Sequence, residues 1–313
     1  MEFDRPFFKK LAHNDTSAAK GHQGGIVIPT NLDEFFPQLS KRITSESPTV
    51  EEFIWAALFV GNSSKGIVSA RYQYQTWGGT RKERRLTQNL GPIRSLAVGG
   101  DYLVIERSLS DPKFYRLTLL KAGTVEYANF LGKVGSRTSG PVYNNDRPVS
   151  ELEVDKALAE QSLREAEVLN LFDNDAAVTE VRSTRVARSR AFQTRILEIY
   201  KSKCAVCGRA FLSPTGSSEV EAAHIVPRGL KGADDARNGL ALCRSHHWAF
   251  DRGLFGVKPD GQILVPGKVS VLPQNAHLVV FDAKPLHPPS NTSLSPVAKA
   301  FEWHMDNLVS AFL

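Results

Sequence analysis

The sequence predicts an α+β protein with more than one domain: a β-rich N-terminal domain, a helical linker and a smaller C-terminal domain with many loops. At 313 residues and 42% hydrophobic content the chain is long for one domain and can bury two cores. Short apolar runs fill residues 24–131, a polar stretch follows them, and the three cysteines come together near the end. We expect the domains to cover residues 1–134 and 191–313, with linker and helices over 135–190.

The N-terminal part consists of short runs of β-forming residues between turn residues. Glycine, asparagine, aspartate and proline break the pattern at regular intervals. Many short strands with regular breaks are typical of a small barrel or sandwich. The runs that carry this prediction are 25–29, 53–60, 66–75, 101–107 and 114–120.

A change of composition marks the linker. Residues 135–147 are rich in Gly, Ser, Asn and Pro and lack periodicity, which indicates an interdomain connection. Ser150 with Glu153 forms the pattern of a capping box, so we expect a helix over 151–171 with an acidic polar face.

The following segment, 181–203, is basic and leads into the cysteine-containing region. A basic helix at this place can lie along a phosphate backbone, and a solvated charged face is the alternative. Further on, the pattern predicts a hairpin over 255–265 that turns at Asp260-Gly261. Residues 295–313 place apolar residues on one side of a helix, for core packing or, alternatively, for a dimer contact.

Composition limits the classes of protein. No apolar run approaches the roughly 20 residues of a membrane span, and residues 1–10 lack the order of a secretory signal. We therefore expect a cytoplasmic protein without a membrane partner. The net charge of +6 is a modest excess, and its distribution says more than its size.

The cysteines have the spacing of a metal site. Cys204 and Cys207 form a CxxC pair, and Cys243 and His246 form a CxxH pair. Two such turns present four ligands tetrahedrally to zinc, which contributes to the folding of a domain with many loops. We therefore expect a structural Zn²⁺ ion, saturated by protein ligands; the alternative is three buried thiols and a surface histidine.

Three short stretches lie within or beside this frame: 221–225 (EAAHI), 236–240 (ARNGL) and 247–253 (HWAFDRG). Their order of histidine, asparagine and histidine resembles the HNH endonuclease family, whose ββα-metal finger hydrolyses phosphodiesters. The resemblance implies that His224 is the general base, that Asn238 orients the loop bearing it, and that His247 binds the catalytic metal. Taken alone, His224 would be a core histidine and Asn-Gly simply a turn.

The two adjacent histidines should serve different sites. A helix rotates His247 by ~100° from His246, so His246 should face zinc and His247 the cleft, although the opposite assignment is open. Many members of the family carry an acid or histidine before the base, where this chain has Ala223. Glu221 is the nearest acidic candidate for a Mg²⁺ or Mn²⁺ ligand, with an ordinary surface glutamate as the alternative.

The first half of the chain carries a second resemblance. Residues 7–16 (FFKKLAHNDT), 21–29 (GHQGGIVIP) and 79–87 (GTRKERRLT), with Tyr72 and Tyr74, are similar to the N-terminal effector-binding domain of the restriction enzyme EcoRII. That family is a pseudobarrel related to the plant B-three domains, and it grips the DNA major groove with two arms. The alternative for 81–85 is a charged surface hairpin. The resemblance implies DNA contacts from Asn14, Lys20, His22, Gln23, Arg81, Lys82, Glu83, Arg84 and Arg85.

Together the two resemblances imply a site-specific DNA endonuclease of the restriction type that acts on double-stranded DNA. One HNH centre cuts one strand, so cleavage of both strands requires a homodimer or two sequential visits. A modification-dependent nuclease that attacks methylated DNA is one alternative. A DNA-binding regulator with a decayed nuclease module is the other, which Ala223 would allow and the intact His224, Asn238 and His247 disfavour.

Overall fold

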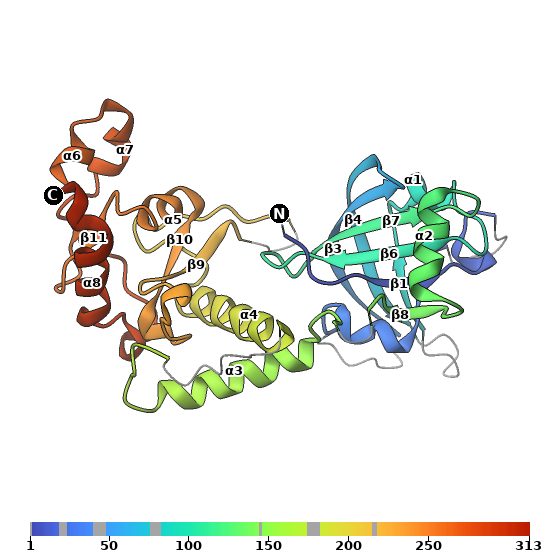
Figure 1. The fold of residues 1–313 in the computed structure, drawn as a ribbon, viewed down its shortest axis with the longest axis horizontal. Coiled ribbons are helices and arrows are strands. Elements are labelled where there is room, and N and C mark those ends of the chain that lie inside the picture. Colours follow the sequence, from blue (N-terminus) through green and yellow to red (C-terminus); the bar gives the residue numbers. More distant parts are fainter. Residues whose placement is uncertain are drawn as a thin grey trace. The chain divides into compact units, whose positions relative to one another are not determined.

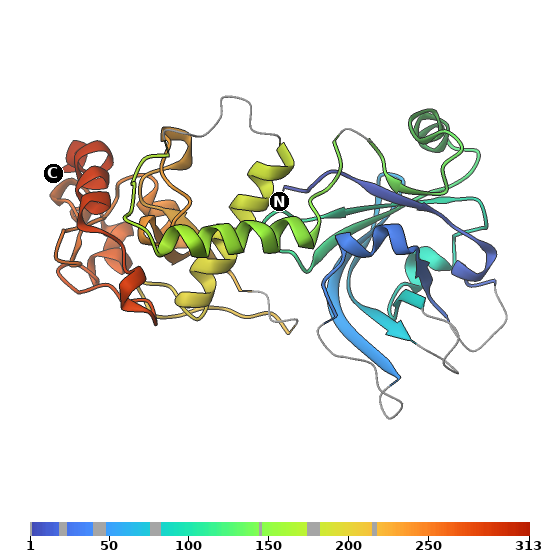
Figure 2. The same cartoon turned by 90° about the horizontal axis from the view of Figure 1, so that it is seen from below.

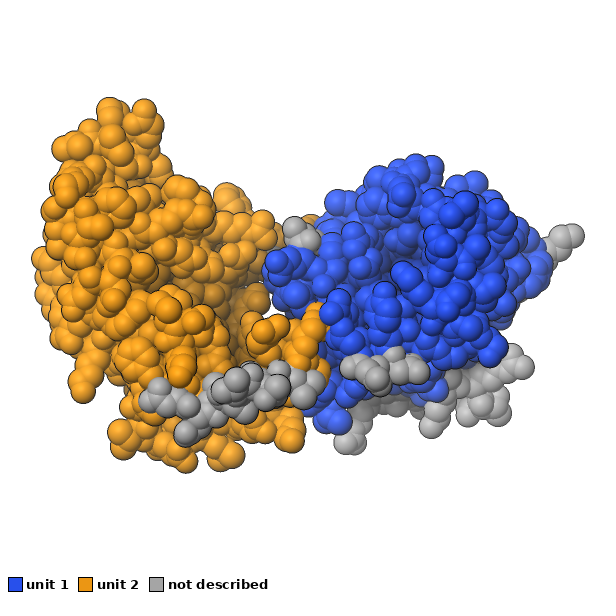
Figure 3. Space-filling model, in the orientation of Figure 1, with its two compact units in different colours: residues 1–153 blue, residues 154–313 orange. Residues whose placement is uncertain are grey.

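The computed structural model describes residues 2–18, 24–39, 48–75, 83–143, 146–173, 182–214 and 218–313. The chain divides into two compact units, Met1–Glu153 and Val154–Leu313, which Figure 3 shows in different colours. Strands dominate the first unit and helices with short strands the second, so the expected α+β class is confirmed. Within the described residues every helix is too short or too polar to cross a membrane.

The described residues of the first unit form an eight-stranded sheet in the order β2-β5-β4-β3-β7-β6-β1-β8. Strands β3 and β7 run parallel and the other neighbours are antiparallel. The sheet curls without closing, as Figures 1 and 2 show. Its strands are β1 (Phe7–Lys10), β2 (Ile26–Ile28), β3 (Thr49–Val60), β4 (Ser63–Gln75), β5 (Glu83–Thr87), β6 (Tyr102–Arg107), β7 (Phe114–Leu120) and β8 (Ser139–Pro141).

Two neighbouring phenylalanines of β1 show how the sheet buries both faces. Phe7 points into the main core, where its ring lies 5.0 Å from that of Phe35. Phe8 points to the opposite face, as the period of two in a strand requires, and its ring lies 5.4 Å from that of Phe130. Phe130 belongs to α2 (Val125–Val134), a helix that the β-rich texture of the sequence did not indicate. Thr124 caps α2 by accepting a hydrogen bond from the Tyr127 N–H.

The segment 135–147 differs from the expected linker. Strand β8 lies within it and pairs with β1 at the edge of the sheet, so the composition of the segment reflects a short edge strand between turns. The chain beyond it is also fixed to the first unit: the fully buried Arg107 donates to the Val149 carbonyl and pairs with Glu151. The first unit therefore continues past the expected limit at residue 134.

Short helical segments complete the first unit. Asp15 ends the turn η1 (His13–Asp15) and forms a buried ion pair with Lys9, with 2.7 Å between Lys9 Nζ and the carboxylate. Because Arg94 also donates to the Asp15 carbonyl, the chain at Asp15, next to the expected DNA contact Asn14, is anchored to the sheet and to α1. The other short helices are η2 (Thr30–Phe35) and α1 (Gly91–Arg94).

The second unit contains a two-stranded antiparallel sheet between helices. Strands β9 (Val220–His224) and β10 (Gly239–Cys243) pair with His224 opposite Gly239, and α5 (Arg244–Phe250) follows β10 directly. One apolar core joins these elements to α4 (Arg182–Ile199) and α8 (Ala298–His304). The remaining elements are β11 (Gly256–Val257), β12 (Ile263–Leu264), α6 (Gly267–Ser270), α7 (Ala276–Val279), and the turns η4 (Arg228–Leu230), η5 (Ala236–Asn238), η6 (Pro273–Asn275), η7 (Thr292–Leu294), η8 (Met305–Val309) and η9 (Ser310–Phe312).

Both predicted helices of the central region are present. Helix α3 (Glu151–Glu165) begins with the expected capping box, in which Ser150 N–H donates to Glu153 and Glu153 N–H donates to Ser150. It ends before the expected limit at Leu171. On α4, Arg195 pairs with Glu165 at 2.8 Å, so acidic partners neutralise part of the basic charge of this helix.

The C-terminal predictions hold in outline. The hairpin of β11 and β12 turns at Gly261, whose φ of 84° suits a glycine. Helix α8 continues into a π-helical turn, η8; of the predicted stripe, Phe301 is buried, and Val297 and Phe312 are half-buried against the core. This burial supports the core-packing interpretation of the apolar stripe.

Candidate functional site

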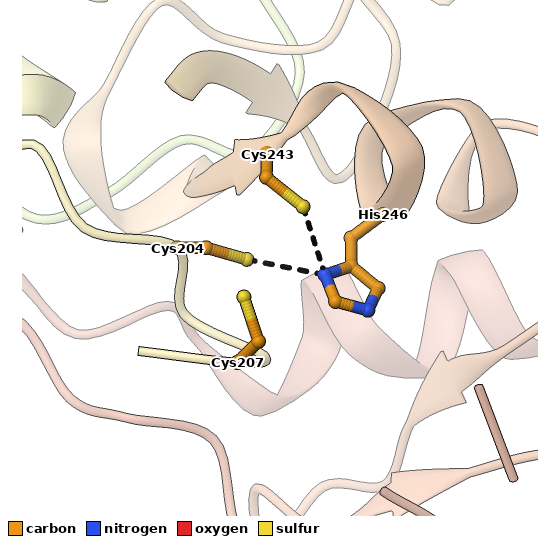
Figure 4. Close-up of side chains that lie close together, drawn as sticks. All are labelled: Cys204, Cys207, Cys243 and His246. Carbon is orange, nitrogen blue, oxygen red and sulfur yellow. Dashed lines mark hydrogen bonds between the residues drawn. The ribbon is translucent and has the colours of Figure 1, made fainter. Parts of the chain in front are cut away.

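Three cysteines and one histidine converge in the second unit. One potential ligand atom from each of Cys204, Cys207, Cys243 and His246 lies within 4.8 Å of the others, and their side chains point toward one another in Figure 4. Cys204 and Cys207 stand on the loop after α4, Cys243 ends β10, and His246 lies on α5. The cluster therefore joins two parts of the chain that are distant in sequence.

The separations fit a tetrahedral metal. His246 Nδ1 lies 3.4 Å from Cys204 Sγ and 3.0 Å from Cys243 Sγ. Sulfur and nitrogen ligands around Zn²⁺ lie about 3.6 Å apart when the bonds are about 2.3 and 2.1 Å. The spacing in the sequence thus predicted a group of side chains that can bind a metal ion.

His224 lies at the end of β9 in a rigid setting. Its ring stacks on Phe192 of α4, with 3.8 Å between ring centroids and 11° between planes. Its Nε2 atom lies 3.0 Å from Oδ1 of Asp234, a buried residue that nothing in the sequence had marked. Burial alone would raise the pKa of Asp234, but the bond to His224 and the charges of His224, Arg228 and Arg188 together lower it.

Asn238 is fully buried and closes the loop between β9 and β10. Its Oδ1 accepts from the Val226 N–H at 2.9 Å, and its Nδ2 donates to the carbonyls of Val226 at 3.1 Å and Ala233 at 3.0 Å. These bonds fix the backbone two residues after His224, at Val226, and directly before Asp234, at Ala233. Asn238 therefore links the chain that follows β9 to the loop that carries Asp234.

His247 faces away from the cysteine cluster. Its Nδ1 lies 3.0 Å from Oε2 of Glu221, and its Nε2 lies 3.5 Å from Oδ2 of Asp251. Burial lowers the pKa of His247, but the bond to Glu221 and the charges of Asp251 and Glu221 outweigh it and raise the pKa. The same bond is the main reason that the pKa of Glu221 is lowered.

His224 and the Glu221–His247 pair lie on opposite faces of β9. His224 stacks against α4, whereas Glu221, an odd number of residues away and so on the other face, contacts α5 through His247. Ala223 shares the face of Glu221 and is fully buried. The structure thus pairs His247 with Glu221 and His224 with Asp234. Apart from the cysteine cluster, the described residues contain no group of three or more His, Cys, Asp or Glu side chains at ligand spacing.

The outer side of α5 carries further polar groups. Arg244 shares Glu221 with His247, with 3.2 Å between Arg244 Nε and Glu221 Oε1. The guanidinium of Arg252 lies 4.5 Å from the centroid of the exposed Trp248 ring. Arg228, by contrast, is committed to Asp173 and Asp234. Arg244 and Arg252 are therefore exposed, and Arg244 reaches His247 through the shared Glu221.

The predicted DNA-contacting residues are described in part. Lys20, His22, Gln23, Arg81 and Lys82 lie outside the described residues. Asn14 is exposed on η1, and Glu83, Arg84 and Arg85 lie on β5. Arg84 pairs with Asp33 and lies 4.8 Å from the centroid of the Tyr74 ring, while the mostly buried Arg85 pairs with Glu83 at 2.7 Å.

Two families of known proteins match parts of the chain. Residues 204–258 match the family model described as HNH endonuclease. Residues 4–103 match the model described as restriction endonuclease EcoRII, N-terminal. The two resemblances found in the sequence are thereby confirmed for these segments. No curated protein matches the chain.

Two solved structures are similar to parts of the chain. One is a modification-dependent TagI restriction endonuclease, with 24% identity and a TM-score of 0.30 over 45% of this chain and 44% of that chain. The other is the B3 domain of the UbaLAI restriction endonuclease with cognate DNA, with 21% identity and a TM-score of 0.28 over 38% of this chain and 68% of that one. The chain thus spans less than half the length of the TagI enzyme that it matches.

Proposed function

We propose that this protein is a site-specific DNA endonuclease of the restriction type. The first unit, residues 1–153, would recognise double-stranded DNA, and the second unit, residues 154–313, would hydrolyse a phosphodiester. The observation that carries this proposal is the arrangement of His224, Asn238 and His247 on one β9-loop-β10-α5 unit within the segment that matches HNH endonucleases.

His224 would act as the general base. Its ring is fixed by Phe192 and Asp234 but is not fully enclosed, since 19% of the side chain is exposed. An imidazole that is neutral near physiological pH can accept a proton from water while the oxygen attacks phosphorus. Asn238 would keep this base in place through its bonds to Val226 and Ala233.

His247 and Glu221 would hold the catalytic cation. Their nearest ligand atoms are 3.0 Å apart, which matches the roughly 3.0 Å between adjacent ligands when bonds to an octahedral ion are about 2.1 Å. A bound Mg²⁺ or Mn²⁺ ion would stabilise the negative charge on the scissile phosphate and the leaving 3′-oxygen. Many HNH enzymes carry a metal-binding residue directly before the base, where this chain has Ala223. Because Glu221 lies on the same face of β9 as Ala223, its carboxylate can take the place of that ligand.

Zinc is the structural metal that we propose for Cys204, Cys207, Cys243 and His246. The donor set of three thiolates and one imidazole favours Zn²⁺ over hard cations, and the closed set of four leaves no position for a substrate. The ion would join the loop after α4 to the start of α5, and so hold His247 in register with β9.

DNA recognition would come from two arms on the curled sheet. One arm covers residues 14–23 and the other residues 81–85, so Asn14, Lys20, His22, Gln23, Arg81, Lys82, Glu83, Arg84 and Arg85 are the proposed contacts. Arginine can read guanine and glutamate can accept from cytosine in the major groove. Since each chain has one HNH centre, we propose that a homodimer cleaves both strands.

Plasmid cleavage tests the function. The wild-type protein should nick and linearise plasmid carrying its site in Mg²⁺ or Mn²⁺, and H224A should abolish cleavage while DNA affinity stays nearly unchanged. H277A, which removes an exposed histidine of α7, is the matched control and should cleave normally. If H224A nicks plasmid as fast as the wild type, the assignment of the base is wrong.

The main alternative is a nuclease with the same hydrolytic mechanism that cleaves only modified DNA. A modification-dependent nuclease would cut methylated plasmid and spare the unmethylated form, so digestion of matched plasmids separates the two functions. A regulator with an inactive nuclease module would bind DNA and cut neither plasmid. Sequencing the ends of digested genomic DNA would give the recognition site.

A further inference from the structure

Asp234 is the carboxylate nearest to the proposed base, although neither the motifs nor the sequence pattern assigns it a role. Its Oδ1 lies 3.0 Å from His224 Nε2, and only 6% of its side chain is exposed. A buried carboxylate is stable only when it is paired and hydrogen-bonded. Asp234 is therefore a fixed partner of His224, held inside the protein by its own hydrogen bonds and ion pairs.

Two arginines hold the second oxygen of this carboxylate. Asp234 Oδ2 lies 3.2 Å from Arg188 Nη2 and 3.4 Å from Arg228 Nε. Asp173 binds the same two arginines at 2.8 and 3.0 Å, which fixes them in turn. Because Oδ2 is paired with the two arginines, Oδ1 is the oxygen that accepts a hydrogen bond from the imidazole N–H.

This arrangement selects one tautomer of His224. An ionised carboxylate only accepts hydrogen bonds, so the hydrogen must reside on Nε2 and the lone pair on Nδ1. The low pKa of Asp234 agrees with an ionised acid. The stacked ring of Phe192 prevents the imidazole from tilting, so Nδ1 is the atom that can accept a proton from water.

The loop geometry links Asp234 to Asn238. Asn238 Nδ2 binds the carbonyl of Ala233, the residue directly before Asp234, and Asn238 Oδ1 binds Val226 N–H, two residues after His224. One buried amide thus sets the positions of both partners of the His224–Asp234 bond.

We propose that Asp234 is a positioning residue that fixes His224 as the Nε2–H tautomer, held in place by Arg188 and Arg228. This role rests on the proposed nuclease function, because it acts through His224. It extends that function by naming the nitrogen that accepts the proton, Nδ1, and the group that determines it.

Single-turnover cleavage of plasmid is the first test. D234N keeps the shape of the side chain but can offer an N–H to Nε2, which favours the other tautomer, so the cleavage rate should fall about 10- to 100-fold. DNA affinity should stay within about threefold, because orientation of the base affects the chemical step. D234E should recover part of the rate, and adding D234N to H224A should lower the residual rate no further.

Asp235 provides the matched control. It is adjacent and similarly buried, but its Oδ2 binds Arg237 Nη2 at 2.8 Å, and in the described structure it makes no hydrogen bond to His224. D235N should lower the melting temperature, but the cleavage rate of the folded protein should stay close to that of the wild type. An equal loss of rate in D234N and D235N, in proportion to their melting temperatures, would overturn the positioning role.

The tautomer can be measured without any cleavage. Long-range ¹H–¹⁵N correlation spectra, with the His224 signals assigned by their loss in H224A, should show a protonated Nε2 and an unprotonated Nδ1 in the wild type and a mixture in D234N. A protonated Nδ1 in the wild type refutes the inference even when the protein cuts DNA. If D234N cuts at the wild-type rate while H224A is inactive, the nuclease assignment stands and the role of Asp234 falls.

Discussion

Asn238 engages both polar groups of the Val226 backbone: it accepts from the N–H at 2.9 Å and donates to the carbonyl at 3.1 Å. This pairing resembles one rung of a β-ladder, with a side chain in place of a strand. It holds the chain where it leaves β9, two residues after His224. An amide is required, because only an amide both donates and accepts at fixed positions.

The isosteric N238D variant removes the donor. Aspartate would place a buried charge against the carbonyls of Val226 and Ala233, so we expect the second unit to lose about 3 kcal/mol or more of unfolding free energy and cleavage to fail. Urea denaturation measures the loss. N307D is the control, because Asn307 Nδ2 binds the Trp303 carbonyl on an exposed surface, and it should change stability by less than about 0.5 kcal/mol.

Removal of the metal ligands should affect one unit only. C207S, or a strong chelator, should unfold the second unit, because a structural zinc supplies about 10 kcal/mol to a small domain. The first unit has its own cores and should keep its β-sheet spectrum. S245A, an exposed change between Cys243 and His246, should bind metal normally. One zinc per chain by elemental analysis is expected, and a C207S protein that melts like the wild type would contradict the proposal.

Arg84 should contribute to DNA binding through charge. R84A removes one cation from the proposed second arm, so the affinity should fall and the slope of log K against log salt should decrease by about 1. R116A is the control on the same sheet, because Arg116 on β7 pairs with Glu106 at 2.6 Å outside either arm. Fluorescence anisotropy over a range of salt concentrations distinguishes the two variants. Equal slopes for R84A and the wild type would remove Arg84 from the interface.

Gly253 should tolerate no side chain. Its φ is 66°, and a Cβ there would lie 2.2 Å from the Leu308 carbonyl oxygen. We expect G253A to destabilise the second unit by about 3 kcal/mol, from backbone strain and overpacking together. Gly261 has a φ of 84° and open space around it, so G261A should cost about 1 kcal/mol. Thermal melting of G261A measures the cost of backbone strain alone, and the additional loss in G253A measures the clash with Leu308.

His304 should make the second unit sensitive to acid. Burial, only partly offset by its bond to the Phe250 carbonyl, lowers the pKa of His304 to about 4. The unfolded chain takes up this proton near pH 6.5, so stability is fully present above that pH and is lost as the pH falls toward 4, by about 3 kcal/mol at most. H304Q should remove this part of the pH dependence of melting, whereas the exposed H277A should not.

Local patterns predicted the elements whose cause is local. The CxxC and CxxH turns, the capping box of Ser150 and Glu153, and the hairpin at Gly261 depend on neighbouring residues, and each lies where the sequence placed it. The short runs of β-forming residues between turn residues likewise predicted much of the curled sheet. Strand β5 carries charges on consecutive residues, and β8 is short and rich in small residues, so neither has the alternating pattern of a half-buried strand.

Long-range contacts determined the features that the sequence did not reveal. Helix α3 ends early where Arg237 donates to the carbonyls of Arg164 and Glu167, which satisfies backbone acceptors from a distant part of the chain. The bond between His224 and Asp234 likewise depends on the path of a loop. In the sequence, Asp234-Asp235 is an ordinary polar turn.

The core of the second unit extends well beyond residues 204–258, the segment that matches HNH endonucleases. Phe192 and Ile196 of α4 fill the space beside Gly239, and Val309 of η8 and Met305 crowd Gly256. A fragment restricted to 204–258 would expose these surfaces to water and lose the ring that stacks on His224. Transferring the proposed nuclease unit to a different protein would therefore require a segment that begins before Arg182 and ends after Val309.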